Sequence, residues 1–357
     1  MGNVLGLDIG GANTKAAYMR TQNGAVEEFW TAFEYFPFWK RDTQQLVSML
    51  SQLREKLAGS SSLDCVGVTM TAELSDAYRT KREGVNHILD CVGAAFVGVR
   101  LLVLNVDAVL QSVESARTEP LRVAAANWAA TGWMVAQKIS HCVVVDVGST
   151  STSIIPITDG KVAAAGKTDL EKLMNGELVY TGSLRTNVAS TVNSVPIRGN
   201  VARVASELFA QSGDVHLVLG KISESDYTSE TADGKGKTRS EALDRLARVV
   251  CADSEMITEQ EIIEIAKYVS GKQVEQIADG LSQVYSVLKS DAKKCVPVVI
   301  TGLGKNFLAK KAAEKAGVAR TIDLDTLIPS AALASPAAGV ALMVATKLEG
   351  RHINWMQ

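Results

Sequence analysis

The sequence predicts an α/β protein of two duplicated domains, each with a mixed sheet flanked by helices, arranged around an interdomain cleft. The chain has 357 residues, which is more than one compact core usually accommodates. A strand that runs into an aspartate, a glycine turn and a second strand occurs at Val4–Tyr18 and again at Val143–Val162. An internal repeat of this kind decides the fold class, because each copy begins one α/β unit.

The first half predicts the order β-β-β-α-β-α-β-α, in which three antiparallel strands lead into a partly parallel sheet. Short aliphatic runs indicate the strands, and a stretch of helical period that stops near Gly59 indicates the first helix. We expect strands at Val4–Leu7, Lys15–Met19, Val26–Phe33, Cys65–Met70 and Leu101–Leu104, and helices around Leu46–Leu57 and at Ala108–Ser115.

The second half repeats the pattern with a large helical insertion at about residues 200–290. Its expected helices are Ser240–Val250, Glu259–Val269 and Gln273–Lys289. The closing elements are strands at Val296–Thr301 and Ala319–Leu324 and helices at Asn306–Ala316 and Ala331–Lys347. We therefore divide the chain into one domain of residues 1–138 plus 330–357 and a second domain of residues 139–329.

Charge and composition exclude several classes of protein. The 37 basic and 39 acidic residues give a formal charge of −2 without a sustained basic stripe, which argues against a nucleic-acid partner. The scattered cysteines predict free, mostly buried thiols and no structural zinc, and they are Cys65, Cys91, Cys142, Cys251 and Cys295. No signal peptide or membrane-spanning run is expected. We expect a cytoplasmic protein with small-molecule partners; a homo-oligomer stays open.

The two turns carry the residue types that bind phosphate. Glycines let backbone N–H groups approach a phosphate without a Cβ in the way. Asp8 and Asp146 would meet phosphate oxygens only through Mg²⁺, which takes carboxylates, phosphate oxygens and water as ligands. The alternative is that both aspartates only cap hairpins, but the matched pair favours phosphate and metal binding. The proposed contacts are Gly10, Gly11, Asn13, Thr14 and Lys15, with Gly148, Ser149, Thr150 and Ser151.

Five further polar residues are candidates for the chemistry. Glu73 and Asp76 follow a buried strand, where ligands gather in open α/β sheets, and either is a candidate general base. A helix-start cap is the alternative for Asp76, and an N-cap is the stronger interpretation of Asp107. Arg185 is a candidate to bind a diphosphate or a carboxylate, because a guanidinium forks onto such oxygens. Asn127 is a candidate for the cleft, because a buried amide needs a partner.

The order of these segments resembles the superfamily that joins actin, the sugar kinases and the heat-shock chaperone ATPases, whose domains are ribonuclease H-like. The two hairpins are similar to its phosphate-binding loops. "VVITGLGKNFLA" (Val298–Ala309) is similar to its nucleoside-side motif, which implies nucleotide contacts for Gly302 and Gly304. "PSAALASPAAGVALM" (Pro329–Met343) resembles its second interdomain helix. Within the superfamily, the turns look most like the hydantoinase A/oxoprolinase group.

Several longer segments resemble one small family linked to tetrahydromethanopterin-dependent one-carbon metabolism. They are "VTMTAELSD", "AAANWAATGW", "GELVYTGSLRTNVAS", "TADG" and "RLARVVCAD". Its methanogen members include a synthase of methanofuran biosynthesis, which joins γ-glutamyltyramine to an aminomethylfuranyl-methyl diphosphate, forms an aryl ether and releases diphosphate. The resemblance therefore implies an Mg²⁺-dependent transferase that acts on a diphosphate ester and a phenolic amine conjugate.

Two other functions stay open. The Gly302-x-Gly304 motif would also suit an ATP-dependent kinase or a ring-opening hydrolase of the same superfamily. Ala12 and Ser153 stand where related loops often carry threonine and aspartate, which would suit a regulatory or scaffold protein that has lost the chemistry. The two intact aspartate–glycine turns favour the enzyme.

Overall fold

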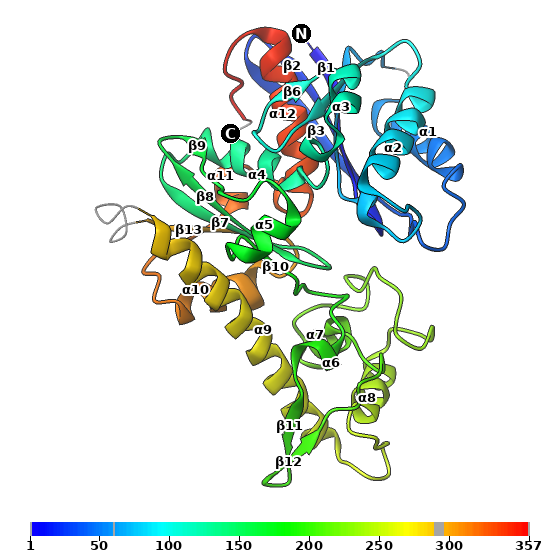
Figure 1. The fold of residues 1–357 in the computed structure, drawn as a ribbon, viewed down its shortest axis with the longest axis vertical. Helices are drawn as coiled ribbons and strands as arrows, with labels where there is room; N and C mark the ends of the chain where they lie inside the picture. Colours follow the sequence, from blue (N-terminus) through cyan, green and yellow to red (C-terminus); the bar gives the residue numbers. More distant parts are fainter. Residues whose placement is uncertain (1, 60, 289–295, 356–357) are drawn as a thin grey trace. The chain divides into compact units, whose positions relative to one another are not determined.

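The computed structural model describes residues 2–59, 61–288 and 296–355. The chain forms two compact units (Figure 1). Unit 1 consists of Met1–Cys142, Ile155–Lys172 and Leu324–Gln357, and unit 2 of Val143–Ile154 and Leu173–Asp323. Each unit is described by itself.

Unit 1 is built on a six-stranded mixed sheet in the order β3-β2-β1-β4-β5-β6. β1, β2 and β3 form an antiparallel meander, β4 and β5 run parallel to β1, and β6 is antiparallel to β5. The strands are β1 (Gly2–Ile9), β2 (Asn13–Gln22), β3 (Ala25–Tyr35), β4 (Cys65–Met70), β5 (Arg100–Leu104) and β6 (Leu110–Gln111).

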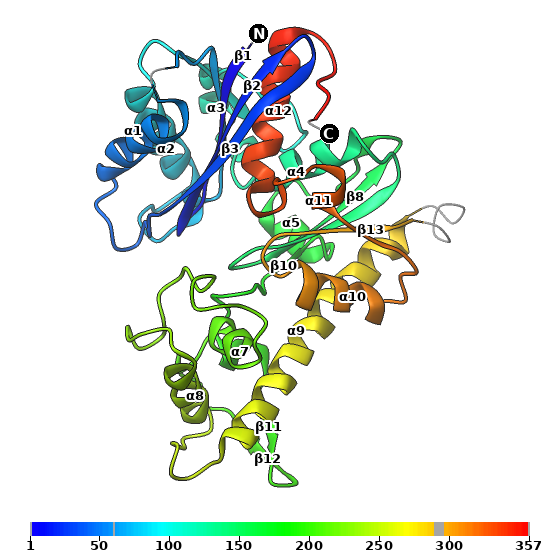
Figure 2. The same ribbon diagram turned by 180° about the vertical axis from the view of Figure 1, so that it is seen from behind.

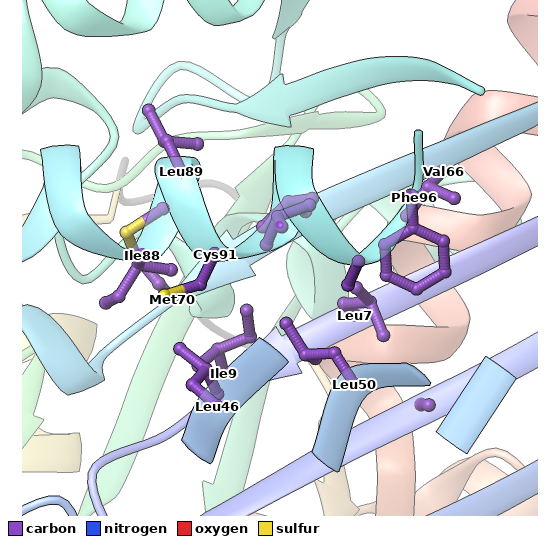
Figure 3. Packing of buried hydrophobic residues seen from close by; sticks show 14 of the residues in the cluster. Leu7, Ile9, Leu46, Leu50, Val66, Met70, Ile88, Leu89, Cys91 and Phe96 are labelled. Carbon is purple, nitrogen blue, oxygen red and sulfur yellow. The ribbon is translucent and has the colours of Figure 1, made fainter. Parts of the chain in front are cut away.

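Helices cover both faces of this sheet (Figures 1 and 2). Leu7 and Ile9 alternate with Asp8 along β1 and pack against α1 and α2, as Figure 3 shows. The opposite face is covered by α12, which packs on β1, β2, β4 and α4. The helices of unit 1 are α1 (Gln45–Ala58), α2 (Lys81–Ala95), α3 (Val113–Thr118), α4 (Asn127–Ala136), α11 (Leu324–Leu327) and α12 (Ser335–Glu349). Its short 3₁₀ turns are η1 (Ala72–Leu74), η2 (Pro120–Arg122) and η4 (Ala332–Ala334).

Two glycines allow α12 to lie close to the sheet. Gly6 of β1 pairs with Gly67 of β4 in register, so both present bare backbone to the same face. A Cβ on Gly6 would overlap the carbonyl oxygen of Ala337, and one on Gly67 would lie 2.6 Å from a methyl group of Val344. The segment Ala332–Glu349 is the one helical stretch among the described residues that is long and apolar enough to span a membrane, but 72% of it is buried inside the protein. It is a core helix of unit 1.

The second sheet lies mostly in unit 2 and has the order β10-β8-β7-β13-β14, with β9, which belongs to unit 1, paired to β8. β7 and β13 run parallel, as do β13 and β14. The strands are β7 (Cys142–Val147), β8 (Thr152–Thr158), β9 (Lys161–Val162), β10 (Leu178–Val179), β13 (Val298–Thr301) and β14 (Thr321–Asp323). The π-helical turn η3 (Lys305–Ala309) leads into α10 (Lys310–Lys315) behind β13, and α5 (Asp169–Met174) precedes β10.

The duplication predicted from the sequence is confirmed by the topology. In both sheets the first strand of the repeat has its hairpin partner on one side and a later, parallel strand on the other. In both turns a glycine N–H donates to the carbonyl oxygen three residues later, from Gly10 to Asn13 at 3.1 Å and from Gly148 to Ser151 at 3.0 Å. The predicted α/β class is therefore correct.

The insertion has a hydrophobic core of its own. It consists of α6 (Val188–Thr191), β11 (Ser194–Ile197), β12 (Asn200–Arg203), α7 (Ser212–Val218), α8 (Arg239–Arg248) and α9 (Glu259–Val287). Capping boxes begin α8 at Thr238 and α9 at Thr258. The prediction of two helices after Glu259 was wrong, because α9 runs without a break through Gly271. One helical glycine costs only about 1 kcal/mol, and burial of both halves of α9 offsets this.

Three other expectations differ from the structure. The segment 155–172, which we placed in the second domain, groups with unit 1, because Ile155 and Val162 lie against Gly132 of α4. The helix predicted at Ala108–Ser115 is β6 followed by α3, which begins after the cap Ser112. Cys65, Cys91 and Cys142 are buried free thiols, whereas Cys251 is exposed and Cys295 lies outside the described residues.

We predict that Gly6→Ala destabilises the protein by about 1–3 kcal/mol, because the new methyl group must push α12 away from β1. Gly93→Ala is the matched control, since nothing lies within 4 Å of the added Cβ on α2. Urea unfolding should show Gly93→Ala at least as stable as the wild type. Equal stability of the two variants would contradict the packing described for α12.

Candidate functional site

The carboxyl ends of the parallel strands of unit 1 bring three acidic residues to one edge of the sheet. Asp8 lies at the end of β1, Glu73 in η1 just after β4, and Asp107 just after β5. Ligands of open α/β sheets gather at this edge. The sequence patterns predicted all three positions.

The first turn is held rigidly at the end of β1. A Cβ on Gly10 would lie 2.6 Å from the carbonyl oxygen of Asn13, so only glycine fits there, whereas the space beside Gly11 is open. The carbonyl oxygens of Gly11 and Ala12 accept hydrogen bonds from the backbone N–H groups of the chain after β3, at 3.0 and 2.9 Å. The turn therefore has a fixed shape with open space at Gly11.

Asp8 is 5% exposed, and its carboxylate faces polar partners. Asn127 Nδ2, at the start of α4, donates to Asp8 Oδ1 at 3.5 Å. Lys15 and Thr69 are its register partners on β2 and β4, so they share its face of the sheet. Thr14 pairs instead with Ile9, on the opposite face, and is fully buried. The Thr14 hydroxyl, which we predicted to contact phosphate, therefore does not lie beside Asp8.

Glu73 is a buried carboxylate with an ammonium group beside it. Its side chain is fully buried, and Lys81 Nζ lies 3.3 Å from its Oε1. Burial raises the pKa of Glu73 from its ordinary 4.5 to about 7, although the charge of Lys81 opposes this. A carboxylate with a pKa near neutrality can take up a proton at physiological pH, as a general base must.

Local sequence signals place Glu73 against α2. Thr80 caps α2 by accepting a hydrogen bond from the N–H of Glu83 at 3.2 Å, which puts Lys81 at the first helical position. Gly84 of α2 lies very close to Glu73, because a Cβ added to Gly84 would be only 2.6 Å from the Cα of Glu73. The alternative role for Asp76 as the helix cap was wrong: Thr80 is the cap, and Asp76 is exposed.

Asp107 is held in ion pairs and does not cap a helix. Its carboxylate contacts the guanidinium of Arg122 and lies 3.1 Å from Lys167 Nζ. Asn105 closes a turn here by accepting from the N–H of Asp107 at 3.0 Å, and α3 begins only at Val113. The interpretation of Asp107 as an N-cap was therefore wrong, because a local turn competes with the helix.

The second turn, in unit 2, is lined by the segment 182–185. Gly148 O accepts from the N–H of Ser183 at 2.9 Å, and Ser149 O accepts from the N–H of Arg185 at 3.0 Å. Arg185 Nη1 donates to Thr150 Oγ1 at 3.2 Å. A flexible arginine is thereby tethered at a turn predicted to bind phosphate.

The Gly302-x-Gly304 turn lies beside the same aspartate–glycine turn. Thr301 pairs in register with Asp146, and a Cβ on Gly302 would be 2.6 Å from Asp146 Oδ1. Gly302 has φ of +84° and so adopts a conformation that favours glycine. The N–H of Gly304 donates to Val147 O at 3.1 Å. Asp146, Gly148, Gly302 and Gly304 therefore gather at one place in unit 2.

The aspartates of the two glycine turns could hold a magnesium ion only if phosphate oxygens and water supplied its other ligands. Within residues 2–59, 61–288 and 296–355, no three or more His, Cys, Asp or Glu side chains group as a ready-made metal site. Mg²⁺ commonly uses one or two protein carboxylates and completes its shell with substrate phosphates and water. Asp8 in unit 1 and Asp146 in unit 2 each offer such a carboxylate beside a glycine turn.

Sequence reasoning missed Lys81 and Asp169, whose side chains form an ion pair of 2.7 Å at the carboxyl edge of unit 1. It also missed Lys172, whose Nζ lies 4.0 Å from the ring centroid of Trp128. The signal for Asp169 was present, since Thr168-x-x-Glu171 is a capping-box pattern that begins a helix. Nothing in the pattern indicates which distant side chain Asp169 meets.

Comparisons with known proteins agree on a family and a fold. Residues 64–347 match the hydantoinase/oxoprolinase family. The chain is 39% identical to the (4-{4-[2-(γ-L-glutamylamino)ethyl]phenoxymethyl}furan-2-yl)methanamine synthase of Methanocaldococcus jannaschii, over 97% of this chain and 98% of that protein. It is 38% identical to the synthase of the same name from Methanococcus vannielii, over 61% of this chain and 97% of that protein.

Among solved structures, a nucleotide-free acetone carboxylase aligns with a TM-score of 0.56 at 11% identity. The match covers 95% of this chain and 70% of the carboxylase chain. At this identity the likeness concerns the fold.

We predict that the charge of Glu73 makes the protein less stable as the pH rises. Between about pH 4.5 and 7 the folded chain keeps a proton on Glu73 that the unfolded chain has lost, so the free energy of unfolding falls across this window. The Glu73→Gln variant has no carboxyl group to titrate at this position, so it does not show this fall in the free energy of unfolding. Relative to the wild type, the variant should gain up to about 3 kcal/mol between pH 5 and pH 8 in denaturant unfolding.

The control is Asp76→Asn, which changes an exposed carboxylate three residues away. Its difference from the wild type should stay constant over the same range. A constant difference for Glu73→Gln as well would show that Glu73 is not buried as described.

Proposed function

Because the chain belongs to the hydantoinase/oxoprolinase family, and because two of its relatives carry one enzyme name, we propose that it is a (4-{4-[2-(γ-L-glutamylamino)ethyl]phenoxymethyl}furan-2-yl)methanamine synthase of methanofuran biosynthesis. The observation that carries this proposal is 39% identity over nearly the full length of both chains.

The proposed reaction is an alkyl transfer with loss of diphosphate. The phenol oxygen of γ-glutamyltyramine attacks the methylene carbon of (5-(aminomethyl)furan-3-yl)methyl diphosphate and forms the aryl ether. The bond from that carbon to the diphosphate oxygen breaks, and its electron pair leaves with the diphosphate. The phenolic proton passes to a base. No oxidant, reductant or nucleotide is needed for this balance.

We assign the base to Glu73. The phenol has an ordinary pKa of about 10, so it attacks well only if its proton is removed as the new bond forms. Glu73 lies at the carboxyl edge of the sheet of unit 1, where burial gives it a pKa of about 7. Asp76, the other candidate from the sequence, is exposed and has no comparable burial.

We assign phosphate binding to the two glycine turns, each taken by itself. Backbone N–H groups at Gly11 in unit 1 and at Ser149–Ser151 in unit 2 are the donors that an anion would use. Mg²⁺, when bound, would neutralise charge on a phosphate, and Asp8 in unit 1 and Asp146 in unit 2 are the carboxylates that would serve it. Arg185, tethered at Thr150, would bind either the diphosphate or the γ-glutamyl carboxylate.

We predict that the purified protein, incubated with Mg²⁺ and both substrates, yields the ether and one diphosphate per ether by mass spectrometry and phosphate release. Asp8→Asn and Asp146→Asn should each reduce this rate at least about 100-fold, because each removes a charge that serves the metal. Chelation of Mg²⁺ should abolish turnover of the wild type.

Asp244→Asn, an exposed carboxylate on α8, is the control and should keep wild-type activity. Absence of ether at high enzyme concentration would refute the synthase. Magnesium-dependent ATP binding in calorimetry, without ether formation, would instead favour the kinase or ring hydrolase suggested by the Gly302-x-Gly304 turn.

We predict that Glu73→Gln lowers kcat about 100-fold or more with little change in KM, because a general base contributes 10²–10⁴-fold to the rate. Asp76→Asn is the matched variant and should retain most of the activity. The reverse ranking would assign the base to Asp76. An active Glu73→Gln enzyme would remove Glu73 from the mechanism while leaving the synthase assignment intact.

A further inference from the structure

Lys81 lies between two carboxylates in unit 1. Its Nζ is 3.3 Å from Glu73 Oε1 and donates a hydrogen bond to Asp169 Oδ2 at 2.7 Å. The Glu73 side chain is fully buried, while those of Lys81 and Asp169 are each 23% exposed. Lys81 is thus the charged link between a buried acid and a solvent-accessible one.

Asp169 is held in place by its own helix start. Glu171 Oε2 accepts from the N–H groups of Lys167 and Thr168, at 2.7 and 3.1 Å, and Thr168 Oγ1 accepts from the N–H of Glu171 at 3.3 Å. This reciprocal capping fixes the first residue of α5, which is Asp169. Its position therefore follows from local backbone bonding and does not require Lys81.

The segment 167–172 is anchored on both sides of Asp169. Lys167 Nζ pairs with Asp107 at 3.1 Å, and the buried Lys172 lies over the ring of Trp128. The segment therefore places the Asp169 carboxylate 2.7 Å from Lys81 Nζ, on an ammonium group that lies 3.3 Å from Glu73.

We propose that Lys81 is a positioning residue that keeps Glu73 ionised and ready to accept a proton, and that Asp169 holds the Lys81 ammonium in this place. This inference rests on the proposed role of Glu73 as the base. Lys81 acts through Glu73, and nothing in the arrangement requires it to touch a substrate.

The charges that face Glu73 have opposite effects on its protonation. From α2, Lys81 stabilises the carboxylate and lowers its pKa, and from α5, Asp169 raises it. Burial raises the pKa more than Lys81 lowers it. If Lys81 were only a structural link, its replacement would change stability but would not change the pH at which Glu73 loses its proton.

The test is the pH dependence of kcat/KM for ether formation. Lys81→Met should move the acid limb upward by about 1–3 pH units, because an opposite charge within 4–6 Å shifts a carboxyl pKa by that amount. Lys81→Arg should restore the wild-type limb. Asp169→Asn should move the limb to lower pH, because the amide oxygen can still accept the hydrogen bond from Lys81 Nζ while the negative charge near Glu73 is removed.

Lys56→Met is the matched control, since it removes an ion-paired lysine of unit 1 whose partner is Glu34. Its acid limb should coincide with that of the wild type. An unshifted limb in Lys81→Met, or the same shift in Lys56→Met, would overturn the proposal. Should Lys81→Met fail to fold, Asp169→Asn decides the matter: a limb at lower pH supports the coupling, and an unmoved limb overturns it.

A second measurement separates this inference from the synthase assignment. Infrared titration of the free protein, with Glu73→Gln subtracted, follows the protonated carboxyl band of Glu73 without any substrate. A shift with Lys81→Met but no ether formation would refute the proposed function and preserve the electrostatic coupling. Ether formation with no shift of this band would refute the coupling and preserve the function.

Discussion

The same backbone hydrogen bond occurs in the glycine turn of each repeat and fixes the position of the aspartate beside it. The N–H of Gly10 or Gly148 donates to the carbonyl oxygen three residues later and closes the turn directly after the first strand of each repeat. At Gly10 a Cβ would collide with that same carbonyl oxygen, so the turn depends on glycine. Because the turn is this tight, Asp8 and Asp146 stay at the strand ends, beside backbone N–H groups that a larger side chain would cover.

The glycine turns fix the backbone, whereas the burial of Glu73 lowers the stability of the folded protein at neutral pH. A carboxylate without water around it prefers to be protonated, and one ammonium at 3.3 Å compensates only in part. A residue chosen for stability alone would be apolar or amide-bearing at this place. A destabilised carboxylate at the carboxyl edge of an α/β sheet is typical of functional sites, which is why Glu73 is the candidate base.

The sequence predicted what depends on local pattern, and it failed where distant segments compete. The duplicated turns, the sheet strands and the family resemblance follow from runs of neighbouring residues, and the matched hydrogen bonds at Gly10 and Gly148 confirm the repeat. The unbroken helix α9 was missed because burial, a tertiary effect, overrides the local cost of Gly271. The link from Glu73 to Asp169 was missed because no local pattern encodes a contact across 96 residues, from position 73 to position 169. The roles of the site residues stay predictions.

The two repeats have kept one backbone design and acquired different chemistry around it. Beside the first turn, Asn127 donates to Asp8, and a buried glutamate lies in η1, just after the neighbouring strand β4. Beside the second turn lie Arg185, which donates to Thr150, and the Gly302-x-Gly304 turn after β13. The same backbone turn therefore has an amide and an acid near it in unit 1 and a guanidinium near it in unit 2. The duplication has preserved the geometry of the turn and not the groups around it, because the backbone hydrogen bond depends on glycine whereas the neighbouring side chains come from other segments of the chain.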